Sequence, residues 1–456
     1  MTWRAWLATA GLCVGVVRGG PASLALALIA WGAGSLVLRR RPAVLLAGLV
    51  ALATGSGMVA RGDDRDEVLA SLAERVPHCE LDGRVLEQIG GLGTLVAVRS
   101  LRCPDATIEN GQLVLELPAA DAGARVRAEG WVVPFAGDAF DVARMRAGGD
   151  AAFDPHDVDI GEVAGPLHRI AASLRTALRA ATRGLGSDRA ALVRGLTIGD
   201  TASMTPEDEE LLRRAGLSHL VAVSGSNVAM VLGAVLVLAR GLRPKVRIGL
   251  AAAALVIFVL TVGPEPSVLR AAVMGGIALM ALGAGMRADP LAALGIAVLA
   301  VVAMRPGMVY SVGLHLSVAA TAGLILWARP LAGAMPRMPR LVALGLGATL
   351  AAGAAIAPLT AAVFGQVSLA SPLANLLAMP AVAPATIAGI GAALVELVRL
   401  PGAGLVADLA GWCAAWILAV GRTLGGQGWS SIEVPAWTGA VLAVPVIAAA
   451  VRCARG

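Results

Sequence analysis

Long apolar segments dominate the chain, and a single long polar stretch separates them into two groups. Three apolar segments open the sequence, near residues 3–17, 21–38 and 43–60. About nine more follow residue 216, and most have the roughly 20-residue length that a helix needs to cross a bilayer. Their approximate limits are 217–239, 246–262, 267–285, 289–304, 308–328, 340–364, 372–397, 404–423 and 434–451. The pattern predicts a polytopic α-helical membrane protein with about twelve spans.

The polar stretch, residues 61–165, has the period of short β-strands. Apolar and polar residues alternate in Gly83–Leu86, Thr94–Arg99, Leu113–Leu117 and Arg125–Trp131, and turn residues separate these runs. Alternation of this kind predicts strands with one buried face. We expect a small all-β domain inserted between the membrane helices, a compact barrel for which an OB-fold is the natural candidate.

Residues 166–215 have a helical, amphipathic pattern with arginines among leucines and alanines. Within them, Thr205–Glu209 places an N-cap residue, a proline and three acidic residues in succession, which predicts a helix start. We expect these helices to lie along the membrane–water interface. The domains are therefore residues 1–60, 61–165, 166–215 and 216–456, the last being the main transmembrane domain.

Composition excludes an ordinary soluble protein. Hydrophobic residues make up 57% of the 456 residues, charged residues 15%, and the mean hydropathy is +0.77. The run Arg39–Arg41 predicts a cytoplasmic loop, which places both chain ends in the cytoplasm and residues 61–165 outside. Arginine-bearing loops at 240–247, 285–290 and 328–340 fall on the same cytoplasmic side, whereas Arg305 and Arg422 do not. A multi-pass protein of the cell membrane follows.

The external domain is acidic, with 20 acidic and 10 basic residues between positions 61 and 165. Domains that grip single-stranded nucleic acid combine a positive groove with stacking aromatic rings. We therefore expect this domain to gate or to dock partners rather than to grip DNA. A local basic face remains an alternative, around Arg99, Arg102, Arg125 and Arg127.

The sequence offers little catalytic or metal-binding equipment. The five histidines have no metal-pairing spacing, no Cys-x-x-Cys occurs, and Lys245 is the only lysine and lies outside any phosphate loop. We expect no enzyme activity, no metal and no cofactor. Cys79 and Cys103 would face an oxidising compartment, which favours a disulfide; two free cysteines are the alternative.

Polar residues within the apolar segments are the candidate functional residues. Ser224, Ser226 and Asn227 either form a helix contact, with the asparagine as a hydrogen-bonding group, or belong to a broken helix that lines a pore. Arg270, which follows Ser267 on the same segment, would pair with Glu265, contact a phosphate or reach out to the interface. The remaining candidates are Ser317, after His315, and Asn375, between Pro372 and Pro380.

Five stretches, together with Ala139–Val142, are similar to the ComEC-type competence family in order and spacing. They are residues 196–201, 216–233, 266–272, 314–317 and 371–380. The resemblance implies an inner-membrane channel that imports single-stranded DNA during natural transformation. It also implies that Ser224, Asn227, Ser267, Arg270, Ser317 and Asn375 line or shape the DNA path.

Many members of that family carry a C-terminal metallo-β-lactamase domain, and its His-x-His-x-Asp-His run does not occur in this sequence. We therefore expect other DNA-uptake proteins as partners, including a separate motor. Either a separate nuclease also serves, or the chain only conducts. Two alternatives remain. The first is a proton-coupled transporter of a small solute that uses Glu396 or Asp408 as a relay. The second is a non-transporting assembly protein that docks partners on the acidic domain.

Overall fold

The computed structural model describes most of residues 77–435 and a few residues between 437 and 446. The gaps within that range are residues 89–92, 105, 110, 118–122, 134–150, 164, 202, 222–223, 264, 305–307 and 309–310. The predicted helices at 3–17, 21–38 and 43–60 lie outside the described residues, as do Arg39–Arg41, the stretch 139–142, Arg305 and most of 434–451.

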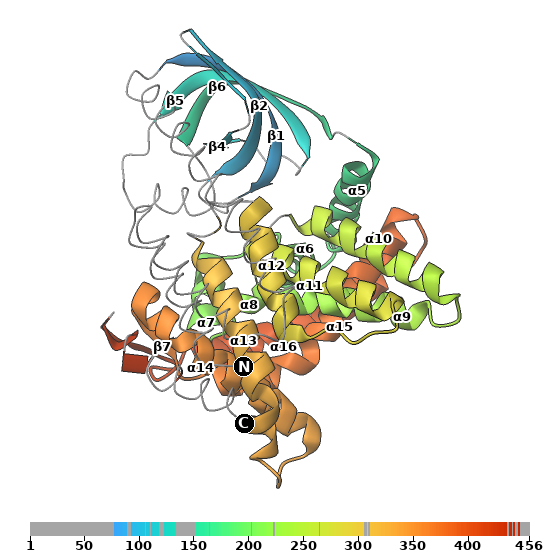
Figure 1. Cartoon of the computed structure of the whole chain (residues 1–456), viewed down its shortest axis with the longest axis vertical. Helices are drawn as coiled ribbons and strands as arrows, with labels where there is room; N and C mark the ends of the chain where they lie inside the picture. The colour runs from blue at the N-terminus through green and yellow to red at the C-terminus, as the bar shows by residue number, and fades with distance from the viewer. Residues whose placement is uncertain are drawn as a thin grey trace, which may run out of the picture.

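The polar stretch folds into a β-barrel at one end of the molecule (Figure 1). β1 pairs with both β2 and β5, β5 pairs with β6, β6 runs parallel to β4, and β4 pairs with β2, so the ladder returns to its start. The short β3 adds to β2 outside this ring. The strands are β1 (His78–Gln88), β2 (Thr94–Cys103), β3 (Ala106–Ile108), β4 (Gln112–Leu115), β5 (Ala124–Val133) and β6 (Ala151–Val163).

The predicted small barrel is therefore confirmed, while its assignment as an OB-fold stays a prediction. The four alternating runs of the sequence lie in or overlap β1, β2, β4 and β5. In β5 the alternation is complete, with Val126 and Ala128 buried and Arg127 and Glu129 exposed. Because successive side chains of a strand point to opposite faces, this pattern gives the barrel an apolar interior and a charged exterior.

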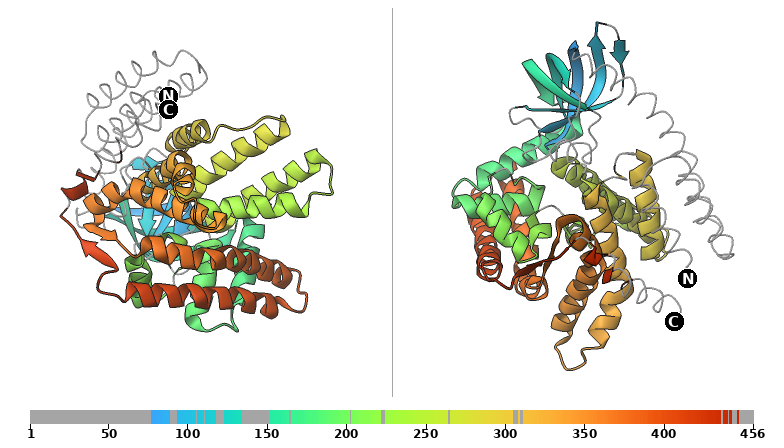
Figure 2. Two further views of the ribbon diagram at one scale, coloured as in Figure 1. Left: turned by 90° about the horizontal axis from the view of Figure 1, so that it is seen from below. Right: turned by 90° about the vertical axis from the view of Figure 1, so that its left-hand side faces the viewer.

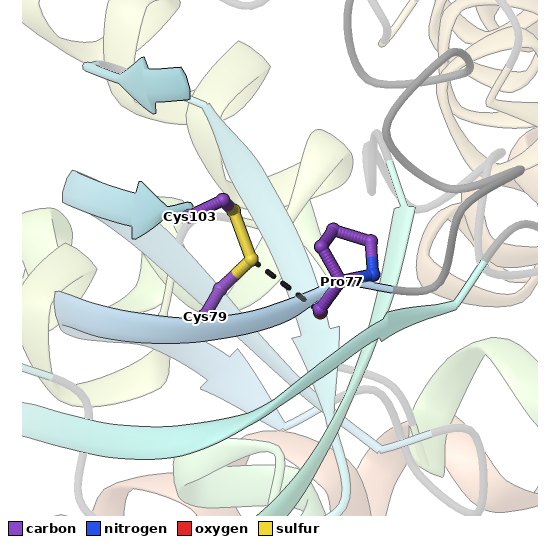
Figure 3. The surroundings of a disulfide bond; sticks show 3 residues. All are labelled: Pro77, Cys79 and Cys103. Carbon is purple, nitrogen blue, oxygen red and sulfur yellow. Dashed lines mark hydrogen bonds between the residues drawn. A yellow bond between two sulfur atoms is a disulfide. The ribbon is translucent and has the colours of Figure 1, made fainter. Parts of the chain in front are cut away.

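A disulfide joins Cys79 of β1 to Cys103 at the end of β2, as the sequence favoured (Figure 3). The two Cα atoms are 4.4 Å apart. Neighbouring residues Glu80 and Arg102 are cross-strand partners, which places the cysteines directly opposite one another. The Sγ atom of Cys79 also lies 3.5 Å from the carbonyl oxygen of Pro77, at the start of the barrel.

Replacing Cys79 and Cys103 together by alanine is expected to destabilise the barrel by about 3 kcal/mol, because the bridge closes a loop of moderate length in the unfolded chain. Urea unfolding of the full chain in detergent, followed by proteolysis within the barrel, measures the change. Cys413→Ala, which removes a free cysteine from the helix Ala403–Gly425, is the matched control. An unchanged midpoint in the double variant, or an equal shift in the control, would contradict this expectation.

Residues 166–425, where the structure describes them, are mostly helical and lie below the barrel in Figure 1. Figure 2 shows the same separation, with the hairpin of α13 and α14 extending away from the barrel. The helices are α5 (Pro166–Ala181), α6 (Ser187–Ile198), α7 (Pro206–Arg214), α8 (Ser218–Val221), α9 (Gly225–Leu238), α10 (Pro244–Val262), α11 (Pro266–Gly283), α12 (Pro290–Met304), α13 (Val312–Gly333), α14 (Arg340–Phe364), α15 (Ser371–Leu397) and α16 (Ala403–Gly425). Two short strands, β7 (Gln366–Ser368) and β8 (Ser431–Glu433), pair antiparallel.

Among the described residues, six helices are long and apolar enough to cross a membrane: α10, α11, α13, α14, α15 and α16. Their outer faces carry large apolar side chains that a water-soluble protein would bury. Leu341 is 85% exposed, Leu405 77% and Trp412 75%. Exposed apolar surface on this scale suits contact with lipid. The chain is a multi-pass membrane protein, and the count of about twelve spans stays a prediction.

One predicted segment differs from the structure. The span expected at 217–239 is divided into the short α8 and the 14-residue α9, because Ser224 has an extended backbone (φ −103°, ψ 163°) that ends the helical path. Most of α6 is buried against α15 and α16, and the expected position of the helices of 166–215 along the interface stays a prediction. Small residues such as Ala191 allow this close packing of α6. The helix start predicted at Thr205 is confirmed, because the Thr205 hydroxyl accepts a hydrogen bond from the Asp208 N–H at 3.2 Å.

Candidate functional site

The break before α9 leaves a polar helix N-terminus that is half-buried at Ser224 and Gly225 and exposed at Ser226. Ser224 precedes the helix without capping it through its side chain. Its hydroxyl lies 2.5 Å from the hydroxyl of Ser226, and the latter hydroxyl donates to Asn227 Oδ1 at 3.4 Å. The first N–H groups of a helix have no partners within the helix, and the helix dipole gives this end partial positive charge. The start of α9 is therefore a place that favours an anion.

Asn227, in the first turn of α9, is buried, and its amide contacts both this N-terminus and a neighbouring helix. Its side chain is 2% exposed, and its Nδ2 donates to the carbonyl oxygen of Leu196 at 2.8 Å. Leu196 lies in the last turn of α6, where carbonyl groups lack a partner within the helix. Asn227 therefore joins α9 to α6, which fits the helix-contact interpretation for this residue.

Arg270 of α11 is a buried cation between helices, with 5% of the residue exposed. Its Nη2 faces Gly225, since a Cβ atom added to that glycine would lie 2.7 Å away. Its Nη1 donates to the hydroxyl of Thr321 on α13 and lies 3.9 Å from the sulfur of Met274. The Nε atom has no hydrogen-bond partner in the part of the chain that the structure describes.

The contacts of Arg270 with the described residues are thus to neutral groups. Neither the predicted pairing with Glu265 nor the predicted extension to the interface describes its position, because the side chain is buried against α9 and α13. A buried charge is costly unless it is paired or serves a function. Together, Ser224, Gly225, Ser226, Arg270 and Thr321 form what we call the Arg270 site.

Two further predicted residues lie beside this site. Ser267 is one turn before Arg270 on α11, and Ser317 is one turn before Thr321 on α13. The carbonyl oxygen of Ser317 accepts the Thr321 hydroxyl at 2.9 Å, so Ser317 orients the hydroxyl that contacts Arg270. The sequence did not identify Thr321, whose importance comes from a contact with a residue 51 positions away.

Asn375 belongs to a different cluster, at the start of α15. Its Nδ2 donates to the carbonyl and hydroxyl oxygens of Ser371, at 2.9 and 3.1 Å, and to the carbonyl oxygen of Gly216 at 3.4 Å. Gly216 has φ +75°, and a Cβ there would lie 2.4 Å from that of Ser371. Asn375 therefore holds the turn before α8, and the structure does not bring it to the Arg270 site.

Two other arginines, which the sequence left without partners, connect helices. The Nη1 of Arg175 on α5 donates to the carbonyl oxygens of Leu260 and Thr261, at 3.0 and 3.1 Å, which lie at the end of α10. Arg422 on α16 contacts Asp208 through two hydrogen bonds of 2.7 Å and Asp188 through one of 2.6 Å. These long-range partners have no signature in the local sequence.

The basic face suggested for the barrel is a groove of mixed charge. Three of the four arginines line this groove together with five carboxylates, so the groove has more acidic than basic side chains and is not a basic face. The lining charges are Glu80, Asp82, Arg102, Arg125, Arg127, Glu129, Asp157 and Asp159. Arg125 donates to both carboxylate oxygens of Asp82, at 3.0 and 2.7 Å, and these hydrogen bonds hold the pKa of Asp82 below its ordinary value. Cross-strand pairs of opposite charge stabilise adjacent strands.

The helical part of the chain, which contains the Arg270 site, has a counterpart among known families. The family model described as Competence protein matches residues 196–455, from the last turn of α6 onward. No curated protein and no solved structure matches the chain. The family match covers more than half of the chain and confirms the resemblance seen in the five stretches. The chain therefore belongs to the Competence protein family.

Proposed function

We propose that this protein conducts single-stranded DNA across the cell membrane during natural transformation, and that the DNA backbone passes the Arg270 site. Membership of the Competence protein family supports a role in DNA uptake. The observation that carries the finer proposal is Arg270, a guanidinium buried in a candidate membrane helix, whose partners among the described residues are neutral and whose Nε has no partner among them.

The chemistry of the Arg270 site suits a phosphodiester. Arginine presents a planar set of N–H donors to phosphate oxygens, and its charge persists in an apolar environment. The N-terminus of α9 adds a second source of positive potential, because Gly225 lies against the guanidinium. The neighbouring serine and threonine hydroxyls donate or accept, so a passing backbone finds several weak partners rather than one tight site.

The alternative of a proton-coupled solute transporter has less support. Asp408 is exposed near the start of α16, and Glu396 is half-buried near the end of α15. A proton relay needs ionisable groups that face the bundle interior at membrane depth. The driving force and any strand degradation are proposed to come from separate proteins, a motor and a nuclease, that assemble with this chain.

Deletion of the gene in a transformable host, with complementation by the wild-type chain, tests the proposal. Labelled DNA bound at the cell surface is scored separately from DNA protected inside the cytoplasm. We expect the deletion strain to bind DNA outside but not to import it, and complementation to restore import. Import at the wild-type level in the deletion strain would overturn the proposal and favour transport of another solute.

A further inference from the structure

Three side chains with metal-binding atoms meet on the outer face of the barrel. They are His78 of β1, Glu129 of β5 and His156 of β6, and one ligand atom from each lies within 4.8 Å of the other two. All three residues are exposed. The sequence predicted no metal site because these residues are far apart along the chain, and only closure of the barrel brings them together.

The strand register explains why they share one face. His78 is opposite Trp131, and Glu80 is opposite Glu129, so all four side chains point outward from the β1–β5 pair. Between β5 and β6, Glu129 is opposite Asp157 and Gly130 is opposite Pro155, which leaves His156 as the extra residue of a β-bulge. Bulges turn a side chain away from the regular alternation, and this one directs His156 toward His78.

The bulge depends on a glycine. A Cβ atom added to Gly130 would lie 2.1 Å from the carbonyl oxygen of Asp154 and 2.8 Å from the Cα of Pro155. Only a residue without a side chain lets β6 approach β5 this closely. The barrel thus holds His156 in place through a tight backbone contact, with Pro155 at the bulge, a position that tolerates the missing N–H.

We propose that His78, Glu129 and His156 bind a Zn²⁺ ion. Two imidazoles and one carboxylate are the ligand set of many zinc sites with an open fourth position. Zinc bonds of about 2.0–2.2 Å require the ligand atoms to approach to roughly 3.3 Å of one another. Exposed side chains reach that spacing by rotation about their side-chain torsions. A water molecule or an external anionic oxygen completes the coordination.

Ring packing alone does not account for the cluster. The rings of His78, His156 and Trp131 have centroids 5.0–5.5 Å apart and meet at 44° to 79°. Such contacts explain two histidines beside a tryptophan, but not a carboxylate within reach of both imidazoles. A bound zinc ion would tie three strands together and would add two positive charges to an acidic domain.

Zinc binding to the full chain tests the inference, with the protein purified in detergent through a tag that contains no histidine. Calorimetric titration with ZnCl₂ is expected to give one ion per chain. His78→Ala and His156→Ala are each expected to weaken binding by at least about tenfold, and Glu129→Gln by a similar factor. Glu80→Gln, which removes a neighbouring carboxylate from the same face, is the matched control and should bind as the wild type does.

Fluorescence locates the ion. Co²⁺ replaces Zn²⁺ in sites of this type and quenches nearby indoles, so it should quench Trp131 and lose that effect in Trp131→Phe. Absence of zinc binding would overturn the inference. Binding that is unchanged in the His78→Ala/His156→Ala double variant would overturn it equally. Melting curves in EDTA show whether each variant folds, which separates loss of a ligand from loss of the barrel.

Discussion

Replacing Arg270 by methionine is expected to abolish DNA entry while DNA continues to bind at the cell surface. The substitution removes the buried guanidinium and keeps a long unbranched side chain that packs beside Met274. If DNA phosphates pass the Arg270 site, loss of this cation raises the barrier for a polyanion in an apolar bundle by several kcal/mol, since a buried charge interacts strongly at low dielectric constant. Uptake of protected labelled DNA, at matched protein level in the membrane, measures the effect.

Stability separates this functional role from a structural one. The partners of Arg270 among the described residues are neutral, so its removal leaves none of them as an unpaired buried charge and relieves the cost of burying the guanidinium. Arg270→Met should therefore melt at or above the wild-type temperature while losing uptake, and a structural role predicts that both fall together. Gly225→Ala keeps the charge but places a Cβ 2.7 Å from Nη2, so we expect it to lower uptake less. Normal DNA entry in Arg270→Met would remove the Arg270 site from the mechanism.

The sequence predicted those elements whose pattern is local. Alternation located β1, β2, β4 and β5, and the apolar segments located α10 to α16 within a few residues. The sequence did not predict β6, because Pro155 and the acidic residues around it are unusual in a strand, and only pairing with β5 and β4 makes them one. Barrel closure joins residues far apart in sequence, which no periodicity of a single segment can indicate.

The candidate site was predicted as a set of residue types and not as an arrangement. Polarity within apolar segments selected Ser224, Ser226 and Arg270, which the structure brings together. The same criterion selected Asn227 and Asn375, whose amides bind backbone carbonyls of Leu196 and Gly216. A side-chain amide in an apolar segment looks the same whether it binds a helix end or a ligand, and the difference depends on tertiary contacts.

Replacing Asp208 by alanine is expected to loosen α16 from α6 and α7, with a loss of about 2 kcal/mol in unfolding free energy. Asp208 is 4% exposed and receives two hydrogen bonds from Arg422. Hydrogen bonds to charged groups contribute about 1.5–3 kcal/mol, and the half-exposed Arg422 side chain reduces this. α16 and α7 already touch at the backbone, since a Cβ added to Gly425 would lie 2.0 Å from the Leu211 carbonyl oxygen. The two helices therefore cannot move closer together to fill the space that the Asp208 side chain leaves.

A double-mutant cycle of Asp208→Ala with Arg422→Gln, followed by thermal unfolding in detergent, measures the coupling, and additive effects of the two changes would contradict it.

Acid should weaken the second contact of Arg422, the hydrogen bond to Asp188. Hydrogen bonds from Arg422 and then Ser187 hold the pKa of Asp188 below its ordinary value. Its contribution is therefore complete above the unfolded pKa of about 4 and is lost as the pH falls through the lower folded value. Asp188→Asn should remove that acid-sensitive part and leave the Asp208 coupling in place, because the two carboxylates bind Arg422 through separate hydrogen bonds.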